Sequence, residues 1–291
     1  MAAPPDSIVE MNGPVLVFGG SYSNLEATLA LQREAVRLGI GPDNIICTGD
    51  VVAYCADPLA TVAAIRDWGV PVIMGNCEES LGWSKDDCGC GFEEGTACEQ
   101  LSIDWYSYAN RALGPEDRAW MRSLPRRLDV VIGKRRLAVV HGSVDSINQF
   151  VFASTPWPDK ERQIAASGCD GVIGGHSGIP FSHAAGGRLW HNSGALGMPA
   201  NDGTPRVWYS LFVPSGDDIE IRLMSLQYDA GATARKMRER GLPAGYADAL
   251  ETGLWPSCDV LPAAELAERG DALAPDDLLW APERTKVSAD L

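Results

Sequence analysis

Short apolar runs alternate with helical repeats along most of the chain. Apolar runs that end in glycine or a polar residue predict buried strands, and they are 15–18, 44–48, 70–74, 136–140, 171–173, 207–213 and 219–226. Apolar residues at helical spacing predict helices, and these cover 24–38, 58–68, about 102–123 and 233–240. This alternation predicts an α/β layered core with a largely parallel sheet.

Two segments depart from this rhythm. The stretch at about 77–100 is rich in Gly, Asp, Glu and Cys, and we expect an irregular, cysteine-rich insert there. From 251 to 291 the chain is rich in Pro, Ala, Asp and Glu, which predicts a peripheral C-terminal tail that is only partly ordered. Residues 1–250, which include the insert, are predicted to form one domain.

The composition limits the classes of function. Of the 291 residues, 45% are hydrophobic, which is enough for a sizeable core, and the net charge of -15 argues against binding to nucleic acid or anionic membranes. A small phosphorylated substrate stays compatible, because a bound cation can reverse the local field. There is neither a basic, apolar leader nor an apolar run of about 20 residues. We therefore expect a cytoplasmic protein.

A polar residue follows the end of several predicted strands. Asp50, Asn76, His141 and His176 all stand at such positions. In open α/β sheets the carboxyl ends of the strands are where sites assemble. One carboxylate, one amide oxygen and two imidazoles make a mixed oxygen and nitrogen site that suits a divalent transition metal. These four residues are the predicted metal ligands.

The order Gly49-Asp50, Gly75-Asn76, His141-Gly142 and Gly175-His176 resembles the calcineurin-like metallophosphoesterases, in their bacterial predicted-phosphodiesterase branch. The resemblance covers roughly 14–250. It implies a four-layer α/β/β/α sandwich with two central mixed sheets and a metal site at the strand ends. It also implies hydrolysis of a small phosphomonoester or phosphodiester by a water activated by Mn, Fe or Zn.

Three departures from the family pattern fall on one metal position. The family's first motif is an aspartate and a histidine separated by one residue, and here those positions hold Gly20 and Tyr22. The second histidine of the last motif is Gly178 here. A fourth departure lies outside that metal position: the family's histidine after Gly-Asn, which contacts the substrate phosphate, is Cys77. The resemblance therefore implies that one metal position is kept and the other is lost or has new ligands. Tyr22 and Cys77 are the candidate catalytic residues.

Five cysteines are predicted near this site: Cys55, Cys77, Cys88, Cys90 and Cys98. Together they could bind a second metal such as zinc, or an iron–sulfur cluster, although their spacing matches no standard signature. Free or redox-active thiols in a surface loop, and a disulfide between two of them, are the other interpretations. The sequence accordingly leaves a second function open, a non-hydrolytic metal or iron–sulfur binding or redox-sensing protein on the same scaffold.

Overall fold

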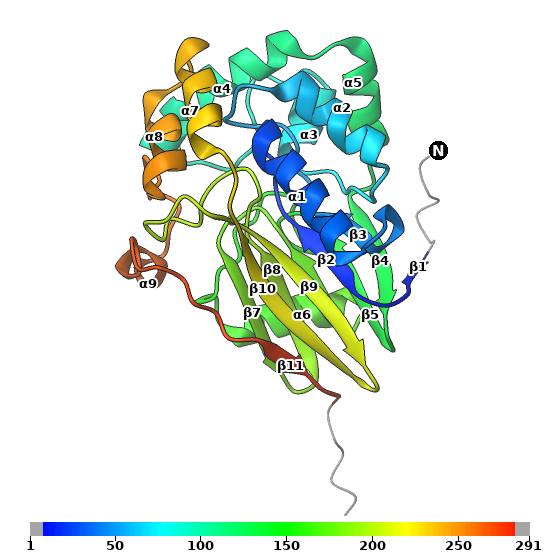
Figure 1. Ribbon diagram of the computed structural model, residues 1–291. Helices are drawn as coiled ribbons and strands as arrows, with labels where there is room; N and C mark the ends of the chain where they lie inside the picture. The colour runs from blue at the N-terminus through cyan, green and yellow to red at the C-terminus, as the bar shows by residue number, and fades with distance from the viewer. Residues whose placement is uncertain (1–7, 283–291) are drawn as a thin grey trace, which may run out of the picture.

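Two mixed β-sheets pack face to face, with helices on both outer faces (Figure 1). The computed structural model describes residues 8–282. The strands are β1 Ile8–Met11, β2 Val15–Phe18, β3 Ile45–Cys47, β4 Arg127–Ile132, β5 Arg135–Val140, β6 Gly171–Gly174, β7 Pro180–Ala185, β8 Arg188–Ser193, β9 Val207–Ser215, β10 Asp218–Leu226 and β11 Leu278–Trp280. The helices are α1 Leu25–Leu38, α2 Pro58–Trp68, α3 Asn76–Gly82, α4 Ala97–Ala112, α5 Pro115–Ser123, α6 Trp157–Ser167, α7 Ala230–Glu239, α8 Ala244–Thr252 and α9 Ala263–Ala267, with a 3₁₀ turn at Pro42–Asn44.

The strand order is β1-β4-β5-β6-β8-β7 in the first sheet and β11-β10-β9-β2-β3 in the second. The pairs β2–β3, β5–β6 and β6–β8 are parallel, whereas β4–β5, β7–β8 and β9–β10 are antiparallel. The expected largely parallel sheet is thus replaced by two mixed sheets, because short connections join three successive strand pairs as hairpins. The four-layer α/β/β/α sandwich implied by the family resemblance is confirmed.

Alternation along the strands explains the layers. In β2, Val15 and Val17 pack against the other sheet, while Leu16 and Phe18 belong to the core beneath the helices that include α1 and α2. On the other sheet, Ala138 and Val140 of β5 face α6. Successive side chains of a strand point to opposite faces, so strands that are apolar at every position can be covered on both sides.

Three predicted elements differ from the structure. The segment at 70–74 makes only an isolated bridge to β3, at Val72, and Pro71 has no N–H to extend the pairing. The predicted helix at 102–123 is two helices, α4 and α5, which the Gly114-Pro115 pair separates. The insert is not irregular throughout, because α3 occupies its start and α4 begins at Ala97.

The C-terminal segment packs onto the sandwich over its described part, 251–282. Strand β11 pairs with β10 as the edge of the second sheet. The backbone N–H of Trp255 donates to Oδ1 of Asn201, and its indole N–H donates to the carbonyl of Pro199. This segment is therefore joined to the domain at both ends. Within residues 8–282, no helix is long and apolar enough to cross a membrane.

Candidate metal centre

The four predicted ligands come from the ends of successive segments at one edge of the sandwich. Asp50 follows β3, Asn76 is the first residue of α3, His141 directly follows β5 and His176 follows β6. Nε2 of His141 lies 3.2 Å from Oδ2 of Asp50 and 3.0 Å from Oδ1 of Asn76. One potential ligand atom from each of Asp50, His141 and His176 lies within 4.8 Å of the other two. The structure therefore brings together the side chains that the sequence singled out.

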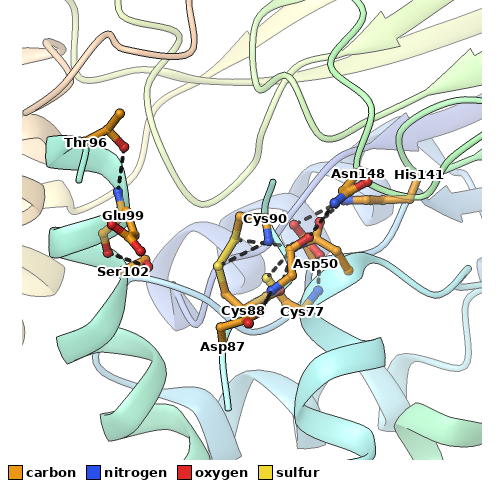
Figure 2. The surroundings of a disulfide bond; sticks show 12 residues. Asp50, Cys77, Asp87, Cys88, Cys90, Thr96, Glu99, Ser102, His141 and Asn148 are labelled. Carbon is orange, nitrogen blue, oxygen red and sulfur yellow. Dashed lines mark hydrogen bonds and ion pairs between the residues drawn. A yellow bond between two sulfur atoms is a disulfide. The ribbon is translucent and has the colours of Figure 1, made fainter. Parts of the chain in front are cut away.

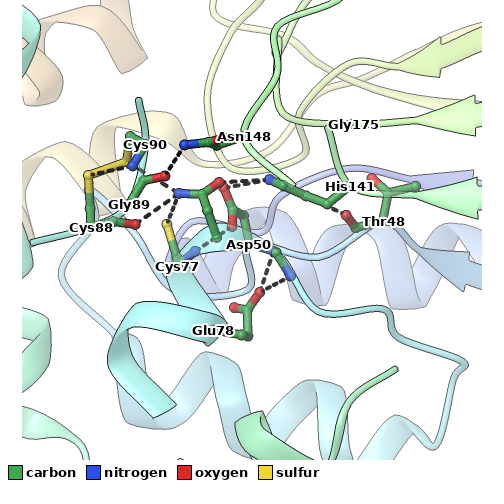
Figure 3. A network of polar contacts seen from close by, with 12 residues as sticks. Thr48, Asp50, Cys77, Glu78, Cys88, Gly89, Cys90, His141, Asn148 and Gly175 are labelled. Carbon is green, nitrogen blue, oxygen red and sulfur yellow. Dashed lines mark hydrogen bonds and ion pairs between the residues drawn. A yellow bond between two sulfur atoms is a disulfide. The ribbon is translucent and has the colours of Figure 1, made fainter. Parts of the chain in front are cut away.

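The orientations of Asn76 and His141 are fixed by backbone carbonyls, which can only accept. Nδ2 of Asn76 donates to the carbonyl of Cys88 at 3.0 Å, so Oδ1 must face His141. Nδ1 of His141 lies 2.7 Å from the carbonyl of Thr48 and must carry a proton there. In a neutral His141, Nε2 is then a lone pair that faces two acceptor oxygens, from Asn76 and Asp50 (Figure 3). Three acceptors at this distance require a proton or a cation between them.

His176 adds a further potential ligand nitrogen to the centre. Its Nε2 is buried and has no hydrogen-bond partner among the described residues. Burial, followed by the charge of His141, lowers the pKa of His176 to about 3, so its imidazole is neutral. A neutral imidazole with an unpaired lone pair is the form that binds a transition metal. The donor set of Asp50, Asn76, His141 and His176 thus fits a divalent cation.

The charges of Asp50 and His141, the other two titratable ligands, stabilise each other. Burial is the largest influence on the pKa of Asp50 and would raise it, but the charges of His141 and His176 and the hydrogen bonds from His141 and Cys77 together lower it. Burial is also the largest influence on the pKa of His141 and would lower it, but the charge and hydrogen bond of Asp50, with Thr48 and Glu78, together raise it. Asp50 is thus a carboxylate, and a cation bound next to it would replace the proton on Nε2 of His141.

The backbone at the centre is strained and closely packed. Asp50 and His176 have φ of 56° and 59°, in the left-handed region that few non-glycine residues adopt. A Cβ on Gly75 would lie 2.1 Å from Oδ1 of Asp50, so only glycine allows the carboxylate to lie against this turn. Strain of this kind persists only where surrounding contacts hold it.

Glu78 supplies those contacts, and sequence reasoning missed it. Its fully buried carboxylate accepts the backbone N–H of Asp50 at 2.7 Å, Val51 at 2.8 Å, Val52 at 3.4 Å and Gly75 at 2.9 Å. Burial and the charge of Asp50 raise the pKa of Glu78 to about 7. Glu78 is the third residue of α3, counted from Asn76, which places it at the acidic position of a capping box. That spacing was the available signal.

Aromatic rings lie at or beside the three positions where this chain departs from the family's metal motifs. A Cβ on Gly20 would lie 2.3 Å from Cε1 of Tyr22, so the Tyr22 ring occupies the space that a side chain at position 20 would need. The Tyr22 ring packs edge-on against Tyr54, with centroids 4.9 Å apart. At the third altered position, a Cβ on Gly178 would lie 3.3 Å from the Trp255 ring.

Cys77 lies at the centre without being exposed. Its backbone N–H donates to Oδ1 of Asp50 at 3.1 Å, and its sulfur lies 3.6 Å from Nδ2 of Asn76. Burial, followed by the charges of Asp50 and Glu78, raises the pKa of Cys77 well above its usual value. The side chain is therefore a thiol rather than a thiolate, and its catalytic role stays a prediction.

The five cysteines of interest occupy different surroundings. Cys88 and Cys90 form a disulfide (Figure 2). A disulfide between two of these cysteines, with the pair unspecified, was one of the interpretations of the sequence. Sγ of Cys90 lies 3.4 Å from Nδ2 of Asn76, whereas Cys55 contacts the carbonyl of Gly197 and Cys98 contacts the hydroxyl of Ser257. Among the described residues, the one group of three or more potential ligands contains no cysteine. A cysteine-ligated metal or cluster stays a prediction.

Comparison with known proteins extends over most of the chain. A family model described as the calcineurin-like phosphoesterase superfamily domain matches residues 22–211. An uncharacterized protein of Methanocaldococcus jannaschii is 25% identical over 256 residues, which span 82% of this chain and 98% of that protein.

Two solved structures share the fold. A metallophosphoesterase from Sphaerobacter thermophilus is 23% identical, with a TM-score of 0.65 over 84% of this chain and 100% of that one. A hypothetical protein from Pyrococcus horikoshii is 18% identical, with a TM-score of 0.71 over 83% of this chain and 99% of that one. The region that the family model matches, residues 22–211, includes Asp50, Asn76, His141 and His176.

Proposed function

Because the chain belongs to the calcineurin-like phosphoesterase superfamily, we propose that it hydrolyses a small phosphate ester with a divalent cation bound by Asp50, Asn76, His141 and His176. The observation that carries this proposal is the convergence of acceptor atoms. Nε2 of His141 faces Oδ1 of Asn76 and Oδ2 of Asp50 at 3.0 and 3.2 Å, and a ring nitrogen of His176 lies within 4.8 Å of ligand atoms of Asp50 and His141.

A divalent cation in this position would polarise a phosphoryl oxygen and lower the pKa of a bound water. The protein's own contribution is to hold the ligands. Thr48 fixes the tautomer of His141, the carbonyl of Cys88 orients Asn76, and Glu78 holds the loop of Asp50. Such supporting contacts keep a site in one geometry.

Of the two predicted catalytic residues, Tyr22 lines a pocket together with His176, and Cys77 does not line it. Burial, followed by the charge of Asp50, raises the pKa of Tyr22 well above its usual value, so the hydroxyl keeps its proton. We propose that this hydroxyl donates a hydrogen bond to the phosphate, and that Tyr22→Phe lowers kcat more than it changes metal affinity.

The test compares Asp50→Asn with Asp67→Asn, an exposed aspartate on α2 that serves as the matched control. Both proteins are loaded with Mn²⁺ and assayed on p-nitrophenyl phosphate and bis(p-nitrophenyl) phosphate, and bound metal is measured by elemental analysis. We expect Asp50→Asn to lower kcat/KM by at least about 100-fold and to lose metal, since it removes a charged ligand. Equal rates and equal metal content in both variants would refute the proposal.

A second candidate is the non-hydrolytic redox or iron–sulfur function. The observation in its favour is the disulfide of Cys88 and Cys90, whose Cys90 sulfur lies 3.4 Å from the amide of Asn76. Anaerobic purification, followed by iron analysis, an absorption spectrum and a thiol titration, tests it. Iron or a reversible change of two thiols, without ester hydrolysis in either state, would favour this function. Hydrolysis that is independent of the redox state would exclude it.

A further inference from the structure

An aromatic pocket opens beside the metal centre. Its walls come from segments far apart in the sequence and include six aromatic side chains: Tyr22, Tyr54, Phe92, Phe150, Tyr246 and Trp255. The insert contributes Phe92 and the C-terminal segment contributes Trp255. The described residues that line the pocket include no Asp, Glu, Lys or Arg. The pocket is therefore lined mainly by aromatic and other uncharged side chains, in a protein whose net charge is -15.

The pocket and the metal centre share walls. His176, a proposed ligand, lines the pocket, and the Phe150 ring packs against its imidazole with centroids 4.2 Å apart. Tyr22 lines the pocket too, and its backbone N–H donates to the carbonyl of Asp50 at 3.2 Å. A group attached to a phosphate at the metal centre would consequently have this pocket next to it.

The rings are held in place before any ligand binds. Tyr54 packs against both Tyr22 and Tyr246, with centroids 4.9 and 4.6 Å away. The indole N–H of Trp255 is already bonded to the carbonyl of Pro199, so the ring offers the pocket only its apolar surface. Preorganised aromatic walls favour a flat ring, which can stack or pack edge-on against them.

We propose that this pocket binds the alcohol portion of the substrate, and that the substrate is a phosphate ester of an alcohol carrying a planar, apolar ring. The proposal rests on the proposed phosphoesterase function. It gives a role to two of the family departures, because Tyr22 replaces a histidine ligand and Trp255 packs where a side chain at position 178 would project. The same changes that remove a metal position thus build the pocket wall.

Three esters of primary alcohols test the ring preference with matched leaving groups: benzyl, cyclohexylmethyl and methyl phosphate. We expect kcat/KM to be at least about 10-fold higher for benzyl than for methyl phosphate, with cyclohexylmethyl phosphate between them. Trp255→Ala should remove most of this ratio. Trp83→Ala, a tryptophan that is 53% exposed, is the matched control and should keep it. A ratio near one in the wild-type protein overturns the proposal, and so does a preference for phosphocholine, which would indicate a cation site.

Trp255→Ala could disturb the C-terminal segment, so Phe92→Leu provides a second variant that removes a ring and keeps apolar volume. We expect it to lower the benzyl-to-methyl ratio by about 3-fold with an unchanged melting temperature. An unchanged ratio in this variant and in a folded Trp255 variant would contradict the proposal.

Binding of benzylphosphonate, which is not hydrolysed, separates the pocket from the reaction. Titration calorimetry with Mn²⁺-loaded protein should give tighter binding of benzylphosphonate than of methylphosphonate, and Trp255→Ala should abolish the difference. If this holds while no ester is hydrolysed, the phosphoesterase function fails and the pocket stands. If all three esters are hydrolysed at similar rates, the pocket proposal fails and the function stands.

Discussion

Replacing Glu78 by glutamine should destabilise the protein more than its single-atom change suggests. The two carboxylate oxygens accept four backbone N–H groups, two each. In Glu78→Gln one oxygen is replaced by an NH₂ group. This group donates hydrogen bonds and cannot accept them, so the two backbone N–H groups that it faces lose their acceptor. The less costly orientation places the NH₂ group toward Val51 and Val52, because the Val52 contact is long at 3.4 Å.

The expected loss follows from these unpaired groups. A buried N–H left without an acceptor costs about 1–3 kcal/mol. One good and one weak bond are lost in the better orientation, so we expect Glu78→Gln to lower the free energy of unfolding by about 2–4 kcal/mol. That is a large part of the roughly 5–15 kcal/mol typical of a domain.

Urea unfolding followed by circular dichroism, at about pH 8.5 and without added metal, measures this loss above the pKa of about 7 for Glu78. Glu79→Gln is the control, because Glu79 lies next in α3 and forms surface ion pairs with Lys85 and Arg126. We expect it to cost less than about 1 kcal/mol. Equal stabilities of Glu78→Gln and the wild-type protein would refute the role of this carboxylate in holding the Asp50 loop.

Three further results are expected. Gly20→Ala should destabilise the protein by about 1–3 kcal/mol, because the new Cβ would lie 2.3 Å from the Tyr22 ring. In a double-mutant cycle, adding Tyr22→Ala should relieve much of that cost. Burial lowers the pKa of Lys160 from 10.5 to about 8. Between these pH values the unfolded chain binds more protons than the folded one, so the free energy of unfolding of the wild-type protein should rise with pH. The free energy of unfolding of Lys160→Met should lack this rise. Replacing Cys88 and Cys90 by serine should weaken Mn²⁺ binding about 10-fold by calorimetry, since their loop orients Asn76; unchanged affinity would contradict that link.

The sequence was sufficient for the parts of the fold that depend on local patterns. Strands such as β2 and β5 are apolar runs with polar ends. His141 follows such a run directly and Asp50 follows another after Thr48 and Gly49, so both the layers and these ligands could be predicted. The segment at 70–74 has the same pattern but makes only one bridge. Its outcome depends on pairing with β3, which an apolar run does not specify.

The remainder of the site depends on contacts between distant segments. Trp255 lies 77 positions beyond Gly178, and nothing in either local sequence indicates that the ring packs there. The cysteines illustrate the opposite difficulty, because Cys55 and Cys98 are close to the site in sequence order yet contact Gly197 and Ser257. Side-chain direction, rather than sequence proximity, decides which groups meet.

The altered half-site is best understood as one change in packing. A side chain at position 20 and the Tyr22 ring cannot occupy the same space, since only 2.3 Å would separate them. Restoring an aspartate at position 20 alone would therefore produce a clash rather than a ligand, and a histidine at position 178 would meet the Trp255 ring, 3.3 Å from its Cβ. We therefore expect that restoring the family's ligands would require the Tyr22 ring to move and the Trp255 ring to shift. Because both rings line the aromatic pocket, a second metal position and the present pocket would compete for the same space.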